Sequence, residues 1–112
     1  MAKVYAFHEI TLKPGVNAQD FERFLIELLA AMPLSGVTNH LVKGDRGKRA
    51  GQYALLSEYD SEETRNRYYP TEGSQGEGME APTQEVMEKW ASFSPTALGD
   101  PETYTDYVAV EQ

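Results

Sequence analysis

Apolar and polar residues alternate along two segments of the chain, and in both segments each set of alternate positions is largely apolar. In residues 3–12, one set comprises Val4, Ala6, His8, Ile10 and Leu12, and the other comprises Tyr5, Phe7, Glu9 and Thr11. Residues 52–60 repeat the pattern, with Tyr53, Leu55, Ser57 and Tyr59 opposite Ala54, Leu56 and Glu58. A strand with one face in water alternates cleanly between apolar and polar residues. Both segments therefore predict strands with two covered faces.

Helical spacing is found in three further segments. The clearest is a stripe with members three and four positions apart, formed by Phe21, Phe24, Leu25, Leu28, Leu29 and Met32. Asn17 is a suitable N-cap for this helix, and Pro33 ends it. A short helix is predicted from the N-cap Ser61 to about residue 69. Another is predicted over about 83–93, where Val86, Met87 and Trp90 have helical spacing.

Two more strands complete the pattern. Residues 37–43 are predicted to form a hairpin with 52–60, because the joint GDRGKRAG contains glycine and aspartate. Residues 103–110 alternate as a last strand, and the polar segment 71–82 is predicted to be a loop, either a lid or simply disordered. This order favours one α+β domain over 1–112, a ferredoxin-like βαββαβ sandwich with a four-stranded antiparallel sheet and helices on one face.

Helices in this order cover only one face of the sheet. The more apolar set of alternate positions, which contains His8 and Ser57, is predicted to lie under the helices. The other set, which contains Phe7 and Leu56, is predicted to face a second copy of the chain. The pattern therefore predicts an obligate homodimer.

The net charge of −8 lies entirely in the C-terminal part of the chain. Residues 1–69 contain nine acidic and nine basic residues, whereas residues 70–112 contain nine acidic residues and a single base, Lys89. An acidic surface repels phosphate groups and anionic lipids, so neither a nucleic acid nor a membrane is expected as a partner. The chain has no cysteine, no apolar run of membrane-spanning length and no apolar signal segment, which predicts a cytoplasmic protein.

Two stretches carry a resemblance to a known superfamily. Leu12-Lys13-Pro14-Gly15 leads from a strand into an amphipathic helix, and YALLSEYDSEETRNRYYP reads as a strand, a cap and a short helix. Together they resemble the dimeric α+β barrel superfamily, which includes antibiotic-biosynthesis monooxygenases, stress-responsive barrel proteins and small polyketide cyclases. The resemblance implies two sheets packed face to face, with a small-molecule cavity between each sheet and its own helices. It implies no single reaction.

His8 is the first candidate for chemistry in such a cavity. A partly buried imidazole can act as a general base near neutral pH; the alternative is a core histidine satisfied by a tyrosine hydroxyl. Tyr53, Ser57 and Phe24 are candidates for contacts with a substrate. Trp90 is a further candidate as the wall of an aromatic pocket, although tryptophan at helical spacing is usually a core residue.

Tyr68 is the second catalytic candidate, at the end of the predicted short helix. In the plant polyketide cyclases of the superfamily, a tyrosine at this position acts with a histidine shortly after the proline. Here Pro70 is followed by TEG, so that dyad is absent. His8 could act with Tyr68 instead. The alternative is that Tyr68 only packs at the end of the helix.

No cofactor or metal is expected. Haem-degrading members of the superfamily carry an axial histidine on the helical side, whereas His8 and His40 both lie on predicted strands. Two histidines with scattered carboxylates give no metal-ligand spacing. His40 would join His8 only if its side of the strand faced the cavity, which the pattern leaves open.

Two functions are compatible with these observations. The first is a cofactor-independent oxygenase or cyclase acting on an aromatic or polyketide-like substrate, with His8 as the base and Tyr68 or Tyr53 as the donor to the oxygen anion. The second is a non-catalytic barrel that binds a small ligand or serves in a stress response. The basic hairpin 43–49 fits a solvated tip, a salt contact with an acidic partner subunit or an anion site.

Overall fold

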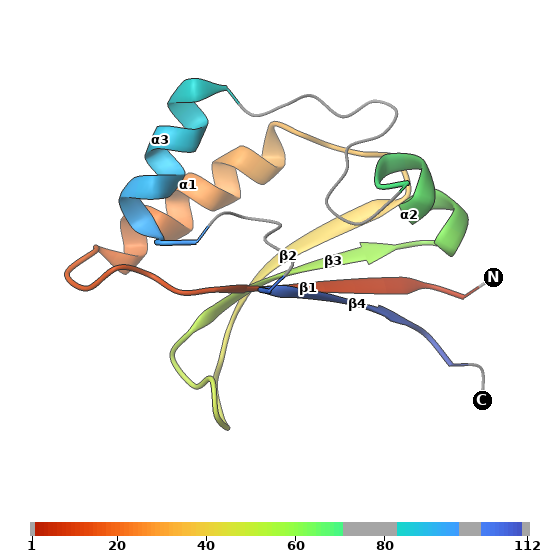
Figure 1. Cartoon of the computed structure of the whole chain (residues 1–112), viewed down its shortest axis with the longest axis horizontal. Coiled ribbons are helices and arrows are strands. Elements are labelled where there is room, and N and C mark those ends of the chain that lie inside the picture. The colour runs from red at the N-terminus through yellow and green to blue at the C-terminus, as the bar shows by residue number, and fades with distance from the viewer. Residues whose placement is uncertain (1, 71–82, 97–101, 111–112) are drawn as a thin grey trace.

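The computed structural model describes residues 2–70, 83–96 and 102–110 (Figure 1). The elements in chain order are β1 (Val4–Ile10), α1 (Ala18–Ala30), β2 (Val37–Lys43), β3 (Tyr53–Tyr59), α2 (Glu62–Tyr68), α3 (Gln84–Phe93) and β4 (Tyr104–Val108). The four strands form one antiparallel sheet in the order β2-β3-β1-β4. The predicted α+β class is confirmed, and the strand order is compatible with a ferredoxin-like fold. The predicted loop 71–82 lies outside the described residues.

The first two helices, α1 and α2, begin at the caps that the sequence predicts. Asn17 Oδ1 accepts a hydrogen bond from the backbone N–H of Asp20 at 3.1 Å, and Ser61 Oγ accepts one from Thr64 at 3.1 Å. Thr83 caps α3 in the same way. Each cap satisfies an amide that has no partner inside the first turn, so the start of each helix is encoded locally.

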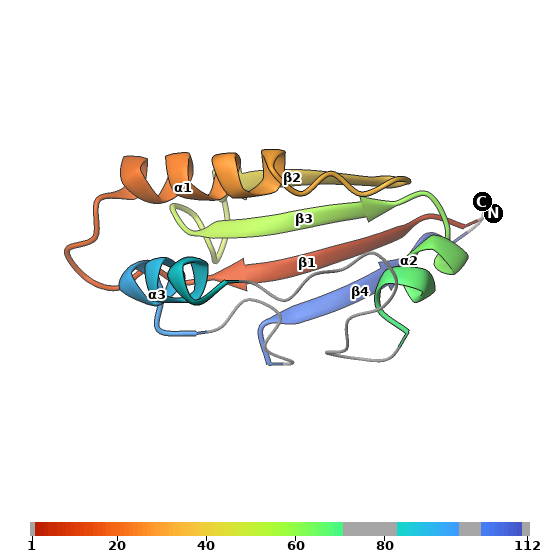
Figure 2. The ribbon, with the colours of Figure 1, turned by 90° about the horizontal axis from the view of Figure 1, so that it is seen from above.

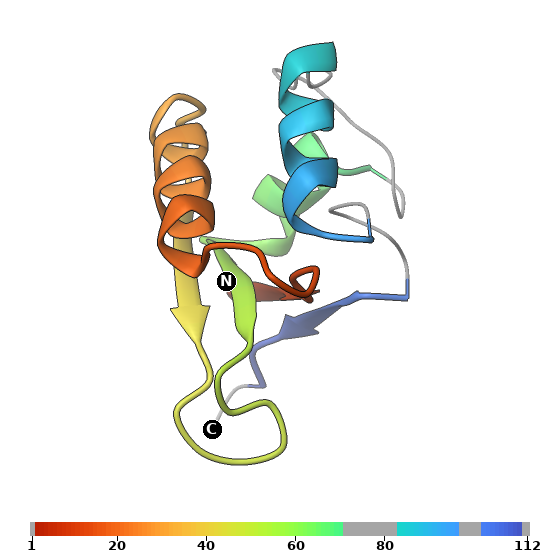
Figure 3. The ribbon, with the colours of Figure 1, turned by 90° about the vertical axis from the view of Figure 1, so that its left-hand side faces the viewer.

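All three helices lie on one face of the sheet (Figure 1, Figure 3). Seen from above, α1 runs along β2 and β3, whereas α3 and α2 lie towards opposite ends of β1 and β4 (Figure 2). Within the described ranges, no helix is both long and apolar enough to cross a membrane. The helix-covered face contains the set of strand residues that the pattern predicts, with seven of them buried: Val4, Ala6, Ile10, Tyr53, Leu55, Ser57 and Tyr59.

The core under the helices has two parts. The buried residues of the first part, which includes residues of α1 and α3, are Ile10, Phe21, Leu25, Tyr53, Leu55 and Phe93. Those of the second part, which includes the last residue of α2, are Val4, Ala6, Tyr59 and Tyr68. Polar side chains of the strands lie between the two parts on the same face: His8, Asn39, Ser57, Tyr104 and Asp106. We call these five residues the polar belt.

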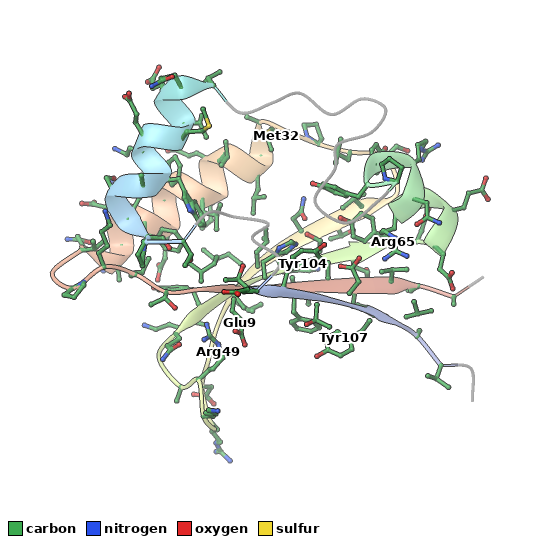
Figure 4. All side chains as sticks on the ribbon, in the orientation of Figure 1. Glu9, Met32, Arg49, Arg65, Tyr104 and Tyr107 are labelled. Carbon is green, nitrogen blue, oxygen red and sulfur yellow. The ribbon has the colours of Figure 1, made fainter. Side chains whose placement is uncertain are left out.

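The opposite face of the sheet, which we call the open face, carries no helix in the described part of the chain (Figure 1). Its residues are Tyr5, Phe7, Glu9, Thr38, His40, Val42, Ala54, Leu56, Glu58, Thr105 and Tyr107. Near its centre, the rings of Phe7 and Tyr107 meet edge to face, with centroids 5.6 Å apart. Ion pairs flank this apolar centre, Arg49–Glu9 at 3.8 Å and Lys3–Glu58 at 3.7 Å. Figure 4 shows Glu9, Arg49 and Tyr107 on this side, away from the helices.

Candidate functional site

His8 lies in the middle of β1, at the boundary between the two parts of the core. Its ring stacks on Tyr104 of β4, with centroids 5.3 Å apart and an angle of 27° between the ring planes. Its Nδ1 is buried and has no hydrogen-bond partner among the described residues. The residue as a whole is only half-buried, and Nε2 is its other ring nitrogen.

The environment of His8 favours its neutral form. Burial lowers the pKa of His8 from its ordinary value of 6.5, because the interior solvates the imidazolium less well than water does. The carboxylate of Asp106 acts in the opposite direction and raises it. Neutral imidazole keeps one lone pair, so His8 has the protonation state of a proton acceptor at neutral pH.

Arg65 of α2 and Asp106 of β4 form an ion pair on the same side of the sheet as His8. Arg65 Nη1 lies 2.6 Å from Asp106 Oδ2, and the two side chains are 21% and 27% exposed. Arg65 Nε also donates to Asn66 Oδ1 at 2.8 Å. A guanidinium carries five N–H groups, and two of those of Arg65 donate to other described residues.

A pocket of about 400 Å³ lies between α2 and β4. Its lining residues are Arg65, Asn66, Tyr69, Pro70, Tyr104, Thr105 and Asp106. Figure 4 shows Arg65 and Tyr104 together on the helix side of the sheet. His8 does not line the pocket, but its ring stacks on that of Tyr104, which is a lining residue. The volume suits a small organic molecule, and the wall combines two aromatic rings with an ion pair.

Two further tyrosines near the pocket keep their hydroxyl protons at neutral pH. Burial raises the pKa of Tyr69, and the charge of Asp106 adds to this effect. Burial also raises the pKa of Tyr59, with smaller contributions from Tyr69 and Asp106. Both hydroxyls are therefore hydrogen-bond donors rather than anions around Asp106.

The two tyrosines predicted to serve a substrate have protein partners. The hydroxyl of Tyr68, which is buried in the second part of the core, donates to the Ser35 carbonyl oxygen at 2.9 Å. The hydroxyl of Tyr53 donates to the carboxylate of Glu22. Burial and this hydrogen bond raise the pKa of Tyr53 to about 12. Neither tyrosine lines the pocket beside α2.

The other predicted contact residues lie in two places. Ser57 belongs to the polar belt and donates to Asn39 Oδ1 at 2.6 Å. Phe24 and Trp90 pack against the first part of the core, and Trp90 Nε1 donates to the carbonyl oxygen of Thr96 at 2.7 Å. The structure thus groups Phe24 and Trp90 with Tyr53, and places His8 and Ser57 together in the belt.

The strand register separates the two histidines. His40 is paired with Leu56 and lies on the open face, whereas His8 is paired with Leu55 and lies under the helices. His40 therefore does not join His8 in a common cavity. In the described ranges, no group of three or more His, Asp or Glu side chains is arranged to hold a metal ion.

The basic hairpin is divided between two environments. Arg49 is half-buried and donates through Nη2 to the Tyr53 carbonyl oxygen at 2.9 Å, so it fixes the base of the hairpin. Arg46 at the tip pairs with its neighbour Asp45, and both side chains are almost fully exposed.

Sequence reasoning missed Arg65, Tyr69, Tyr104 and Asp106 as site residues. One signal was present, because Asp106 is a charged residue in the set of alternate positions of β4 that also contains Tyr104 and faces the helices. A charge at an inward position of a strand is rare unless it is paired. This signal was enough to predict that Asp106 has a charged partner, but not to predict that the partner is Arg65.

Comparison of the chain with protein-family models, with curated proteins and with solved structures gave no match.

Proposed function

We propose that this protein is a small-molecule-binding homodimeric α+β barrel that acts as a cofactor-independent oxygenase or cyclase on an aromatic or polyketide-like substrate. The main support is the position of His8, a half-buried neutral imidazole in a polar belt beside a pocket of about 400 Å³. Removal of a proton next to a carbonyl or phenol oxygen requires a base and a donor to that oxygen. His8 supplies the base.

The donor in this proposal is Arg65. The sequence favoured Tyr68 or Tyr53 in this role, but both of their hydroxyls already donate to protein acceptors. Arg65 lines the pocket, and among the described residues only two of its five N–H groups have an acceptor. The rings of Tyr69 and Tyr104 form aromatic walls in the same pocket, which suits a flat, unsaturated substrate.

The homodimer in this proposal forms through the open face. Its apolar residues are partly accessible in the single chain, with Phe7 and Val42 each 38% exposed and Tyr107 55% exposed. An apolar sheet face with no helix over it is the kind of surface that packs against another sheet in a two-layer sandwich. A second copy of this face would cover Phe7 and its neighbours and leave the helices on the outside.

A non-catalytic ligand-binding or stress-related barrel is the alternative. One contact favours it, the stacking of Tyr104 on His8. The Tyr104 ring is part of the pocket wall and lies between the imidazole and the interior of the pocket. In that case the pocket holds a ligand but His8 removes no proton from it.

The exchange of substrate hydrogen for deuterium tests the proposal. The probe is 2-tetralone, an aromatic ketone with an exchangeable C–H next to its carbonyl, incubated with the protein in deuterium oxide and followed by proton NMR. We expect the wild-type chain to accelerate the exchange, His8→Gln to abolish the acceleration and His40→Gln to preserve it. Equal rates with wild type and His8→Gln would exclude His8 as the base. Binding without acceleration would support the non-catalytic alternative.

A further inference from the structure

The ion pair between Arg65 and Asp106 is the best formed in the described part of the chain. Its N–O distance is 2.6 Å, whereas the other four pairs have distances of 3.7 to 3.9 Å. It is also the least exposed of the five pairs. Loss of water from a charge is costly unless an opposite charge replaces it, so each of these two partly buried charges is stabilised by the other.

The sheet register places the ion pair beside His8. On β4, Tyr104 is paired with His8 and Asp106 is paired with Ala6, so His8 and Asp106 are diagonal neighbours on the helix-covered face. Arg65 approaches Asp106 from α2, and both residues line the pocket together with Tyr104. The carboxylate and the guanidinium therefore lie in the pocket wall, and the imidazole lies behind Tyr104 as a diagonal neighbour of the carboxylate.

We propose that Arg65 is a catalytic residue that binds the carbonyl oxygen of an enolisable aromatic ketone, and that Asp106 is a positioning residue that stabilises His8 once it is protonated. This inference rests on the proposed function and deepens it by naming a substrate class. The substrate carries a C–H group on the carbon next to a carbonyl that is conjugated with, or close to, an aromatic ring.

The reaction step is a proton transfer without a change of oxidation state. The C–H bond of the substrate breaks, its electron pair moves onto the carbonyl oxygen as an enolate, and the proton bonds to His8 Nε2. Because the Tyr104 ring lies between the imidazole and the pocket, the transfer passes through one water molecule. The enolate is formed beside Arg65 and the imidazolium beside Asp106, so each new charge meets an opposite charge that is already in place. Such preorganised charges stabilise a transition state without reorganisation.

Each member of the pair needs the other. Arg65 alone would oppose protonation of His8, and Asp106 alone would oppose formation of the enolate. Together they carry no net charge and still present a positive side to the substrate oxygen and a negative charge to the imidazole. Among the described residues, the other titratable groups near His8 are Tyr104 on β4 and, around Asp106, Tyr59 on β3 and Tyr69 after α2.

The test uses the same deuterium exchange of 2-tetralone, measured as a function of pH. We expect Arg65→Gln to lower the exchange rate about 100-fold, the effect typical of losing one oxyanion donor. The exchange rate plotted against pH should have an inflection at the pKa of His8. Asp106→Asn and Arg65→Gln should move this inflection in opposite directions. Asp106→Asn removes a negative charge and shifts it to lower pH, whereas Arg65→Gln removes a positive charge and shifts it to higher pH. A purely structural role would not produce this pair of shifts.

Matched controls separate this inference from the proposed function. Arg23→Gln and Asp20→Asn alter an exposed ion pair of 3.7 Å and should change neither the rate nor the profile. If His8→Gln abolishes exchange while Arg65→Gln and Asp106→Asn keep the wild-type rate and profile, the role of the ion pair is wrong, including Arg65 as the donor, and His8 stands as the base of the proposed reaction. If wild type gives no exchange, both are wrong for ketone substrates. Should Arg65→Gln fail to fold, Arg65→Lys keeps the charge; an unchanged rate there would overturn the need for the guanidinium.

Discussion

Ser57 Oγ donates a hydrogen bond of 2.6 Å to Asn39 Oδ1 across β3 and β2, inside the helix-covered face of the sheet. This contact satisfies the buried hydroxyl between the two parts of the core, as buried polar groups generally require. On the neighbouring strand β1 of the polar belt, His8 Nδ1 has no such partner among the described residues. The belt thus contains one hydrogen-bonded pair, Ser57 and Asn39, and one ring nitrogen, His8 Nδ1, without a hydrogen-bond partner among the described residues.

The stability of the fold should depend on pH through His8. Burial lowers the folded pKa of His8 from 6.5, so the unfolded chain binds the proton more readily. The stabilising effect of neutral His8 is fully present above the unfolded pKa and is lost as the pH falls through the folded pKa. The urea midpoint should therefore decrease between about pH 7.5 and about pH 5, and His8→Gln should decrease less. An identical decrease in wild type and His8→Gln would contradict this, and His40→Gln is the control.

Gly36 should be intolerant of any side chain. Its φ is +80°, and a Cβ there would lie 2.8 Å from Asp60 Oδ2 and 3.0 Å from Thr64 Cγ2. Gly36→Ala should destabilise the fold by about 1–3 kcal/mol, measured by urea denaturation. Gly15 has the same φ but open space around it, so Gly15→Ala should lose only roughly 1 kcal/mol. Equal losses would show that the steric contact at Gly36 has no effect.

Removal of one charge from the ion pair beside the pocket should destabilise the fold. We expect Arg65→Gln or Asp106→Asn to cost about 1–3 kcal/mol, because each leaves a partly buried charge without its partner. The double variant should cost less than the sum of the two single variants. In the exposed pair, Arg23→Gln should cost below about 0.5 kcal/mol. Additive losses at Arg65 and Asp106 would mean that the pair contributes no coupling energy.

The open face should hold the two copies together. Phe7→Glu places a charge in the apolar centre of that face, and native mass spectrometry should show a dimer for wild type and a monomer for this variant. Ile26→Glu is the matched control, since Ile26 is 58% exposed but lies on α1, and it should remain dimeric. A monomeric wild type would remove the homodimer from the proposal. A dimeric Phe7→Glu would place the interface elsewhere.

Local signals in the sequence predict the elements of this fold well. The alternation of residues 37–43 predicts β2 with the bounds that are observed, and the N-cap at Asn17 predicts the start of α1. The division of β1 and β3 into a helix-covered face and an open face also follows from alternation alone, because the period of a strand fixes which residues share a side.

The site depends on contacts that no local pattern contains. Arg65 and Asp106 are 41 positions apart, and they meet only because β4 pairs with β1 while α2 lies towards the same end of the sheet. The neighbouring residues Tyr68 and Tyr69 illustrate the same limit. Tyr68 points into the core and Tyr69 lines the pocket, and the chain leaves the helix between them. Helical periodicity cannot assign a side to a residue where the helix ends.

The two parts of the core under the helices differ in the number of buried residues. Four buried residues make up the part that contains the end of α2, whereas six make up the part that joins α1 and α3 to the sheet. Regions with fewer buried apolar contacts open at a lower free energy than the rest of a domain. We expect the amide hydrogens of α2 to exchange with solvent before those of α1. A molecule bound between α2 and β4 would then slow the hydrogen exchange of the amides of one seven-residue helix, α2.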